Sequence, residues 1–260
     1  MVVEIRFRAM VTDETKSLLR EYAARYETEK FIDGDPSWFM HQVEDPLDRE
    51  TIAFVAAALS YGSRPQFMPK IETLLNYAEG RPYRWVKESL YEERFSADNH
   101  CCFYRMQQVA HLYEFLSSYS LLLKQYGSLG EFVRSSISSP EAIEALQAIT
   151  AFFAAHGNGG LVPGSTESSC KRLCMFMRWM VRDQSPVDLG LWSGIVKRRT
   201  LIMPMDTHVV KQSVRLGLLS SPTTSMSNAQ RLTRTMAEVF PDDPVRGDFA
   251  LFGYGVNHKI

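Results

Sequence analysis

The sequence has few cysteines and no long apolar run. Its four cysteines stand as Cys101-Cys102 and Cys170-x3-Cys174 among 260 residues, which is neither a disulfide framework nor the spacing of a zinc ribbon or an iron–sulfur cluster. We expect reduced, mostly buried thiols, no bound metal and no cofactor. The longest apolar run, Ile52 to Leu59, is far too short to cross a bilayer, so no membrane partner is expected.

The first ten residues lack the apolar core of a signal peptide, because they carry Glu4, Arg6 and Arg8. Together with the missing membrane span, this predicts a cytoplasmic protein. The hydrophobic content of 45% is ample for a buried core. The net charge of −1 conceals a local excess of positive charge, since residues 165–215 contain nine Lys/Arg and four Asp/Glu.

Helical spacing of apolar residues recurs along the chain, and no segment is typical of a strand. We therefore predict an all-α fold in one domain of residues 1–260, with helical subdomains of about 46–155 and of 1–45 together with 156–260. The glycine-rich segment 156–164 is the clearest break. The predicted helices begin near residue 12 and continue over 46–61, 66–77, 81–89, 104–126, 128–136, 139–155, 168–182, 187–197, 206–216, 227–240 and 244–255.

The predicted helix 168–182 has a cationic face. Apolar residues recur every three or four positions and mark its buried side: Cys170, Leu173, Cys174, Met177 and Val181. Lys171, Arg178 and Arg182 lie within about 40 degrees of one another on a different side. No acid occurs between Ser168 and Arg182 to pair with them. Such a face fits a solvated helix surface, and it also fits a polyanion such as DNA, which we favour.

Two charged residues stand at predicted helix starts. Asp206 follows the apolar approach Leu201 to Met205 and occupies an N-cap position, while Lys171 opens the cationic helix. The aspartate serves either as a cap alone or as a carboxylate that stabilises positive charge on a substrate. A lysine and a carboxylate presented from two helix starts suit amine-nucleophile chemistry.

Three segments carry a family resemblance. Pro204-Met-Asp-Thr-His-Val209, which continues to Arg215-Leu-Gly217, resembles the segment of the helix-hairpin-helix DNA glycosylase superfamily that holds the catalytic aspartate. Ser168 to Phe176 resembles the start of that motif's second helix, where bifunctional members carry a Schiff-base lysine. Thr51 to Ser63 is similar to an early helix and the loop that enters the DNA.

The spacing of these segments distinguishes branches of the superfamily. Lys171 and Asp206 are 35 positions apart, which is longer than in the common members and resembles the archaeal 8-oxoguanine glycosylase branch. The short glycine hairpin of the family is not recognisable. No cysteine follows Cys174, so the resemblance implies no iron–sulfur cluster. The whole chain also resembles an uncharacterised bacterial family, through Asp35-Pro36, Cys170 to Leu173 and Asp248 to Phe252.

The resemblance implies a glycosylase-like fold, in which two helical subdomains flank a cleft and the helix-hairpin-helix is lengthened. It implies a bifunctional DNA glycosylase and AP lyase that acts on a damaged purine in double-stranded DNA, in the cytoplasm and at the nucleoid. Lys171 would attack the sugar C1′, and Asp206 would stabilise the cationic sugar as the base leaves.

Other residues then receive roles from the same resemblance. Phosphate contacts are expected from Arg172, Arg178, Arg182, His208 and Lys211. The loop that fills the gap left by the extruded base would contain Tyr61, Ser63 and Arg64. Phe249 and Phe252 would stack on the base, although aromatic residues at this spacing are also typical of a core.

Two other classes of function fit parts of the sequence. A non-enzymatic helical DNA-binding protein would keep the basic surfaces without needing both Lys171 and Asp206. A small-molecule enzyme or metal-dependent hydrolase would use Asp206 and His208 with a distant histidine such as His41 or His111, although no ligand set has a recognisable spacing.

Overall fold

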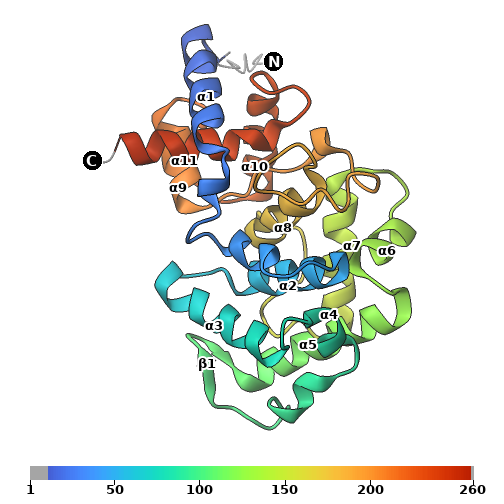
Figure 1. Ribbon diagram of the computed structural model, residues 1–260. Coiled ribbons are helices and arrows are strands. Elements are labelled where there is room, and N and C mark those ends of the chain that lie inside the picture. Colours follow the sequence, from blue (N-terminus) through green and yellow to red (C-terminus); the bar gives the residue numbers. More distant parts are fainter. Residues whose placement is uncertain (1–10, 259–260) are drawn as a thin grey trace, which may run out of the picture.

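A computed structural model describes residues 11–258 and is mostly helical over this range (Figure 1). The all-α prediction is therefore confirmed at the level of fold class. The charged residues that argued against a signal peptide lie in residues 1–10, which are outside the described range. Within residues 11–258, no helix combines the length and the apolar character that a membrane span needs.

One group of helices combines the earliest and latest parts of the described chain. It contains α1 (Asp13–Tyr26), α9 (Thr207–Arg215), α10 (Met226–Ala237) and α11 (Gly247–Asn257). Helix α11 lies between α1 and α9 and contacts both (Figure 1). The contact with α1 is close because Gly253 has no side chain: a Cβ there would lie 2.3 Å from the Tyr26 ring.

A second group surrounds the most apolar helix, α2 (Pro46–Leu59). Asp45 caps α2 by accepting hydrogen bonds from the N–H groups of Leu47 and Asp48, and every residue from Glu50 to Leu59 is buried. Phe54 packs against the rings of Phe115, Tyr119, Phe153 and Phe176. The other helices of this group are α3 (Arg64–Tyr77), α4 (Pro82–Lys87), α5 (Val109–Tyr126), α6 (Leu129–Ser136) and α7 (Ala142–His156).

Helix α8 (Lys171–Val181) joins the two groups, because it packs on α2 and α7 while its arginines reach residues beside α1 and α11. Its predicted buried side is confirmed, since Cys170, Leu173, Cys174, Met177 and Val181 are all buried. Short 3-10 helices occupy several connections: Glu29–Phe31, Pro36–His41, Leu90–Glu93, Arg198–Thr200 and Pro244–Arg246.

The predicted helix 187–197 does not form. The N–H groups of Leu189 and Trp192 donate to the carbonyls of Trp179 and Met180 at 2.7 and 2.6 Å, so the segment is tied to α8 rather than coiled on itself. Gly190 has a positive φ of 67°, which breaks helical geometry. Long turns therefore replace a helix between α8 and α9.

A small hairpin was also missed. β1 (Cys102–Tyr104) and β2 (Gln107–Gln108) form a two-stranded antiparallel sheet, so the helix predicted from residue 104 begins only at Val109. The two cysteines at this hairpin, Cys101 and Cys102, are exposed, whereas Cys170 and Cys174 are buried. The expectation of mostly buried thiols is therefore wrong for half of them.

Candidate functional site

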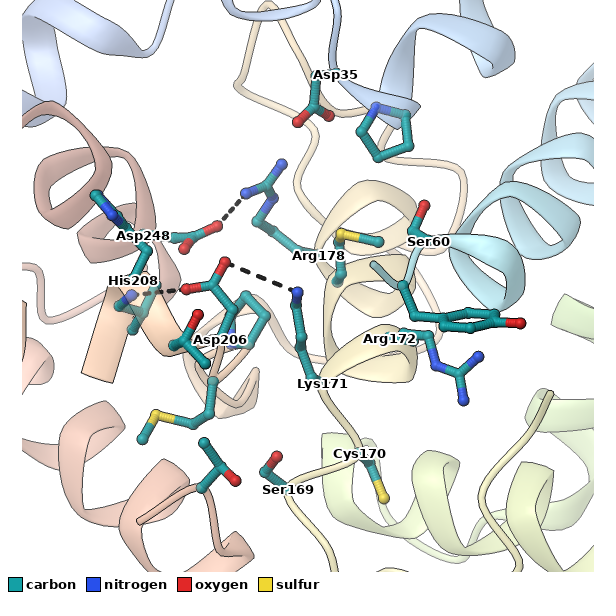
Figure 2. A pocket seen from close by; sticks show the side chains of 18 of the residues that line it. Asp35, Ser60, Ser169, Cys170, Lys171, Arg172, Arg178, Asp206, His208 and Asp248 are labelled. Atoms are coloured by element: carbon teal, nitrogen blue, oxygen red, sulfur yellow. Dashed lines mark hydrogen bonds and ion pairs between the residues drawn. The ribbon is translucent and has the colours of Figure 1, made fainter. Parts of the chain in front are cut away.

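A pocket of about 730 Å³ lies where the two helix groups meet at the start of α8 (Figure 2). Its walls come from the loop between α2 and α3, the first turn of α8, the start of α9, and α11. The lining includes Phe31, Asp35, Tyr61, Arg64, Ser169, Lys171, Arg172, Arg178, Asp206, His208, Asp248 and Phe252. Residues distant in the sequence thus surround one space.

Lys171 is the first residue of α8. Cys170 precedes it in the left-handed conformation, with a φ of 47°, and gives the helix no side-chain cap. The Nζ atom of Lys171 lies 3.8 Å from Oδ2 of Asp206, and each side chain is 37% exposed. The Lys171 amine and the Asp206 carboxylate therefore face one another in the pocket, as Figure 2 shows, while both side chains remain partly open to solvent.

Asp206 occupies the N-cap of α9, as predicted. Its Oδ1 atom accepts a hydrogen bond of 2.6 Å from the N–H of Val209, and the preceding residues from Leu201 to Met205 are buried. This buried segment fixes the backbone position of Asp206, and the capping hydrogen bond fixes the orientation of its carboxylate. One carboxylate oxygen belongs to the helix, and the other is directed to Lys171.

Asp248 is a third charged group in the pocket and stands in the first turn of α11. Burial raises the pKa of Asp248 to about 6, and the nearby Asp206 also raises it, while Arg178 lowers it. Its carboxylate accepts a hydrogen bond from Arg178 (Figure 2). In the sequence, Asp248 was noted only as part of the resemblance to an uncharacterised family, and nothing indicated that it lines the pocket.

Arg178 and Arg182 do not form an exposed cationic face. Both are buried, and both pair with Asp188, which is itself buried. Arg178 also pairs with Asp248, and Arg182 pairs with Glu27 and Asp243. A phosphate contact by either arginine, as predicted, would compete with these ion pairs, and of the two only Arg178 lines the pocket.

The two phenylalanines of α11 occupy different environments. Phe249, predicted to stack on a base, is fully buried beneath the guanidinium of Arg178, which lies 4.6 Å from the ring centre, and it is not among the residues that line the pocket. Phe252 lines the pocket. Its ring lies 5.1 Å from that of Phe31, a pocket residue that the sequence did not identify.

The loop after α2 places two of its three predicted residues at the pocket. Tyr61 and Arg64 line it, whereas Ser63 is exposed beside it. The guanidinium of Arg64 lies 3.1 Å from the Asp35 carboxylate. Asp35 also accepts hydrogen bonds from the backbone N–H and the hydroxyl of Ser37, so it anchors the loop to the 3-10 helix Pro36–His41.

Arg172 is half buried and holds the same loop from the other side. It donates a hydrogen bond to the carbonyl of Ala58, near the end of α2, and its guanidinium lies 5.5 Å from the centre of the Tyr61 ring. Burial lowers the pKa of Arg172. The side chain thus positions the loop in addition to lining the pocket.

Of the two residues on α9 that were predicted to contact phosphate, one lines the pocket and the other does not. His208 lines the pocket, and its buried Nε2 atom has no hydrogen-bond partner. Lys211 is exposed and is not among the residues that line the pocket. His41 and His111 are used elsewhere, since they hydrogen-bond to the backbone of Val187 and Gln108.

Among residues 11–258, no group of three or more His, Cys, Asp and Glu side chains is arranged to hold a metal ion. The pocket presents an amine, carboxylates, guanidinium groups, an imidazole and aromatic rings. An amine with an adjacent carboxylate can form and resolve imines.

Comparison with known proteins identifies a family without an assigned activity. No curated protein matches the chain, and no solved structure matches it. One family matches residues 35–257, a range that includes the hairpin, all the described α-helices except α1, and most of the residues that line the pocket. The chain therefore belongs to the family described as protein of unknown function (DUF2400).

Proposed function

We propose that this protein is a bifunctional DNA glycosylase and AP lyase that removes a damaged purine resembling 8-oxoguanine through an imine on Lys171. The observation that carries the proposal is the facing pair in the pocket, in which Nζ of Lys171 lies 3.8 Å from Oδ2 of Asp206. In this proposal, α8, the long connection and α9 constitute the lengthened helix-hairpin-helix of a glycosylase-like fold.

The reaction needs the lysine as a neutral amine. In the first step, the bond between C1′ and the base breaks, and its electrons leave with the base, which takes up a proton. The carboxylate of Asp206 stabilises the positive charge that develops on the sugar. Lys171, after losing a proton to the nearby carboxylate, forms the new bond from Nζ to C1′.

The second step opens the sugar and cleaves the strand. The ring oxygen leaves C1′ and takes up a proton, which gives an imine between C1′ and Nζ. Removal of a proton from C2′ then breaks the bond between C3′ and its phosphate oxygen, and the phosphate departs. Water hydrolyses the imine and restores the Lys171 amine.

The shape and chemistry of the pocket suit an extruded base. A volume of about 730 Å³ falls within the range of sites for small organic groups. Phe252 and Phe31 offer aromatic surfaces for stacking, and Asp248 offers hydrogen-bonding oxygen atoms. Because a glycosylase must take its target out of the helix, an open pocket with these walls supports the proposal.

Borohydride trapping tests this function. The protein is incubated with duplexes that contain 8-oxoguanine or an abasic site, and reduction converts an imine into a stable adduct. We expect an adduct with the wild-type protein and none with Lys171→Gln. Lys124→Gln is the matched control, because Lys124 is an exposed lysine of α5 outside the pocket, and it is expected to form the adduct.

Two results would count against the proposal. An adduct that persists in Lys171→Gln would show that another amine reacts. Tight binding to duplex DNA without an adduct on either substrate would favour the non-enzymatic DNA-binding alternative. Binding is measured at several salt concentrations, because phosphate contacts weaken as salt increases.

A further inference from the structure

The tip of the β1–β2 hairpin carries the most exposed large apolar side chain of the described residues. Met106 is 82% exposed, whereas Leu121, the next most exposed, reaches 42%. Arg105 and Met106 form the turn between the paired residues Tyr104 and Gln107. An unbranched thioether held in solvent adds little apolar burial to the fold, and it is accessible to a ligand outside the chain.

Two tyrosines bind this hairpin to the loop at the pocket. The hydroxyl of Tyr61 donates a hydrogen bond of 3.1 Å to the carbonyl of Tyr104, and the hydroxyl of Tyr104 donates one to the carbonyl of Tyr61. Their ring centres are 4.8 Å apart. The hairpin and the pocket loop are therefore held together by a reciprocal pair of contacts.

Gly62 allows the hairpin tip to approach the pocket closely. Its φ of 83° favours glycine, and a Cβ at this position would lie 2.6 Å from the Tyr104 hydroxyl and 3.0 Å from a guanidinium nitrogen of Arg105. Gly62 itself lines the pocket. The Arg105 side chain thus lies directly against the pocket's rim.

Further contacts connect the hairpin to Lys171, the candidate nucleophile. Tyr61 packs against Arg172, and Arg172 is the neighbour of Lys171 in the first turn of α8. The hairpin tip is therefore linked to the site through one tyrosine pair and one arginine. Figure 1 shows β1 in the second helix group, beside α5, with which it makes contacts.

The charge around the tip favours a polyanion. No Asp or Glu occurs from Asn99 to Tyr113, while Arg105 is exposed at the tip and Lys70 lies 5.3 Å from the ring of Phe103 on β1. An exposed apolar side chain next to an arginine, on a hairpin that a lysine also contacts, matches nucleic acid, where apolar wedges enter between stacked bases and cations contact the phosphates.

We propose that the Arg105–Met106 tip is a DNA-inserting element, in which Met106 enters the base stack beside the extruded nucleotide and Arg105 contacts the adjacent backbone. This inference rests on the proposed glycosylase function. It adds a second DNA-inserting segment to the loop of Tyr61 and Arg64, which was expected to fill the gap left by the extruded base. Insertion stabilises the kinked duplex from which the base is extruded, so it matters for a paired lesion and not for a single strand.

The test compares two substrates. One is a duplex with 8-oxoguanine opposite cytosine, and the other is a single strand with a pre-formed abasic site. We expect Met106→Ala to slow excision from the duplex by roughly tenfold, a fraction of the few kcal/mol that unstacking costs. Cleavage of the single strand is expected to stay within about twofold of wild type, since it needs Lys171 but no unstacking.

Two variants accompany this comparison. Met106→Leu keeps an apolar wedge and is expected to retain most of the duplex activity. Leu121→Ala removes an exposed apolar side chain from α5, outside the pocket lining, and is expected to match wild type on both substrates.

The outcomes separate this inference from the proposed function. Equal duplex rates for Met106→Ala and wild type would overturn the inserting role, and the wild-type imine would still stand. An equal loss on duplex and single strand would also overturn it, because the change would then act on the site itself. Failure of the wild-type protein to cleave or to be trapped on either substrate would refute the glycosylase function first.

Discussion

Lys171 faces only one of the two carboxylate oxygens of Asp206. Oδ2 lies 3.8 Å from Nζ of Lys171, whereas Oδ1 accepts the hydrogen bond from Val209 that caps α9. The Asp206 side chain therefore has a structural partner and a candidate chemical partner at once. Substitutions that separate these two roles are informative.

Asp206→Asn is expected to preserve the helix and remove the charge. Asparagine caps helices about as well as aspartate, so the free energy of unfolding should change by less than about 0.5 kcal/mol. The rate of base excision should fall by roughly 100-fold or more, because the charge that stabilises the cationic sugar is lost. Urea unfolding and single-turnover excision measure the two effects.

Ser225→Ala is the matched cap control. Ser225 caps α10 through the N–H of Asn228 at 3.2 Å and is not among the pocket residues. Its removal is expected to cost about 1 kcal/mol and to leave excision unchanged. If Asp206→Asn excised the base at the wild-type rate, Asp206 would be shown to act only as a helix cap.

Arg182→Ala is expected to destabilise the protein severely. Arg182 pairs with Glu27, Asp188 and Asp243, and its removal leaves a buried carboxylate at Asp188 with one partner fewer. Breaking a buried pair of this kind costs about 3–5 kcal/mol. Urea unfolding measures the loss.

Arg84→Ala provides the surface comparison. Arg84 and Glu88 form an exposed pair one helical turn apart, and such pairs contribute roughly 0.3–0.5 kcal/mol. Similar losses for Arg84→Ala and Arg182→Ala would contradict the buried network.

Asp248 predicts an unusual dependence of stability on pH. Its folded-state pKa of about 6 is above the ordinary value of 3.8, so between these values the folded protein holds a proton that the unfolded chain releases. The contribution of Asp248 to the free energy of unfolding therefore rises as the pH falls from above 6 toward 4. Asp248→Asn removes this titration.

Urea unfolding of wild type and Asp248→Asn between pH 7.5 and 4.5 tests this expectation. The stability of wild type should increase relative to the variant as the pH is lowered. NMR of the carboxyl carbon gives the pKa directly, and Asp206→Asn should lower it because a neighbouring negative charge is lost. A pKa near 3.8 in the wild-type protein would contradict the burial of Asp248.

Gly255→Ala is expected to disturb α9. A Cβ at Gly255 would lie 2.0 Å from Nε2 of His208, so the imidazole must move within the pocket. Overpacking of this kind costs about 1–3 kcal/mol, which a thermal melt detects as a lower Tm. Gly194→Ala is the control, because nothing lies within 4 Å of its Cβ position; equal melting temperatures for the two variants would show that α9 and α11 are not tightly packed.

The parts of the site that the sequence predicted depend on local signals. Asp206 was recognised as an N-cap and Lys171 as a residue at a helix start, because both signals are contained within a few neighbouring residues. The distance between the two side chains could not be predicted, since it depends on how α8 and α9 pack after a connection of turns.

The arginines of α8 show where local information fails. Helical period places Arg178 and Arg182 on one side, but it does not say whether that side faces solvent. The absence of acids within the helix suggested an uncompensated charge. Two of the three carboxylate partners of Arg182 are instead far away in the sequence, 155 residues at Glu27 and 61 residues at Asp243, and no local pattern reveals them. The third, Asp188, lies six residues on and beyond the end of α8.

The hairpin and the segment 187–197 were missed for a related reason. Residues 102–108 are too short to show an alternating pattern, and their tyrosine contacts join positions 43 residues apart. The apolar spacing of 187–197 is real, as the buried Val187, Trp192 and Val196 show. Those side chains are buried by turns that hydrogen-bond to α8 rather than by a helix.

The packing of α1 on α11 has a consequence for biosynthesis. Tyr26 accepts a hydrogen bond from Asn257, 231 residues later in the chain, and contacts between such distant segments form late because loop closure opposes them. On the ribosome, α8 is synthesised well before α11 supplies Asp248 and Phe252. A nascent chain therefore lacks one wall of the pocket until α11 has been synthesised, and the amine of Lys171 gains its complete surroundings only after that point.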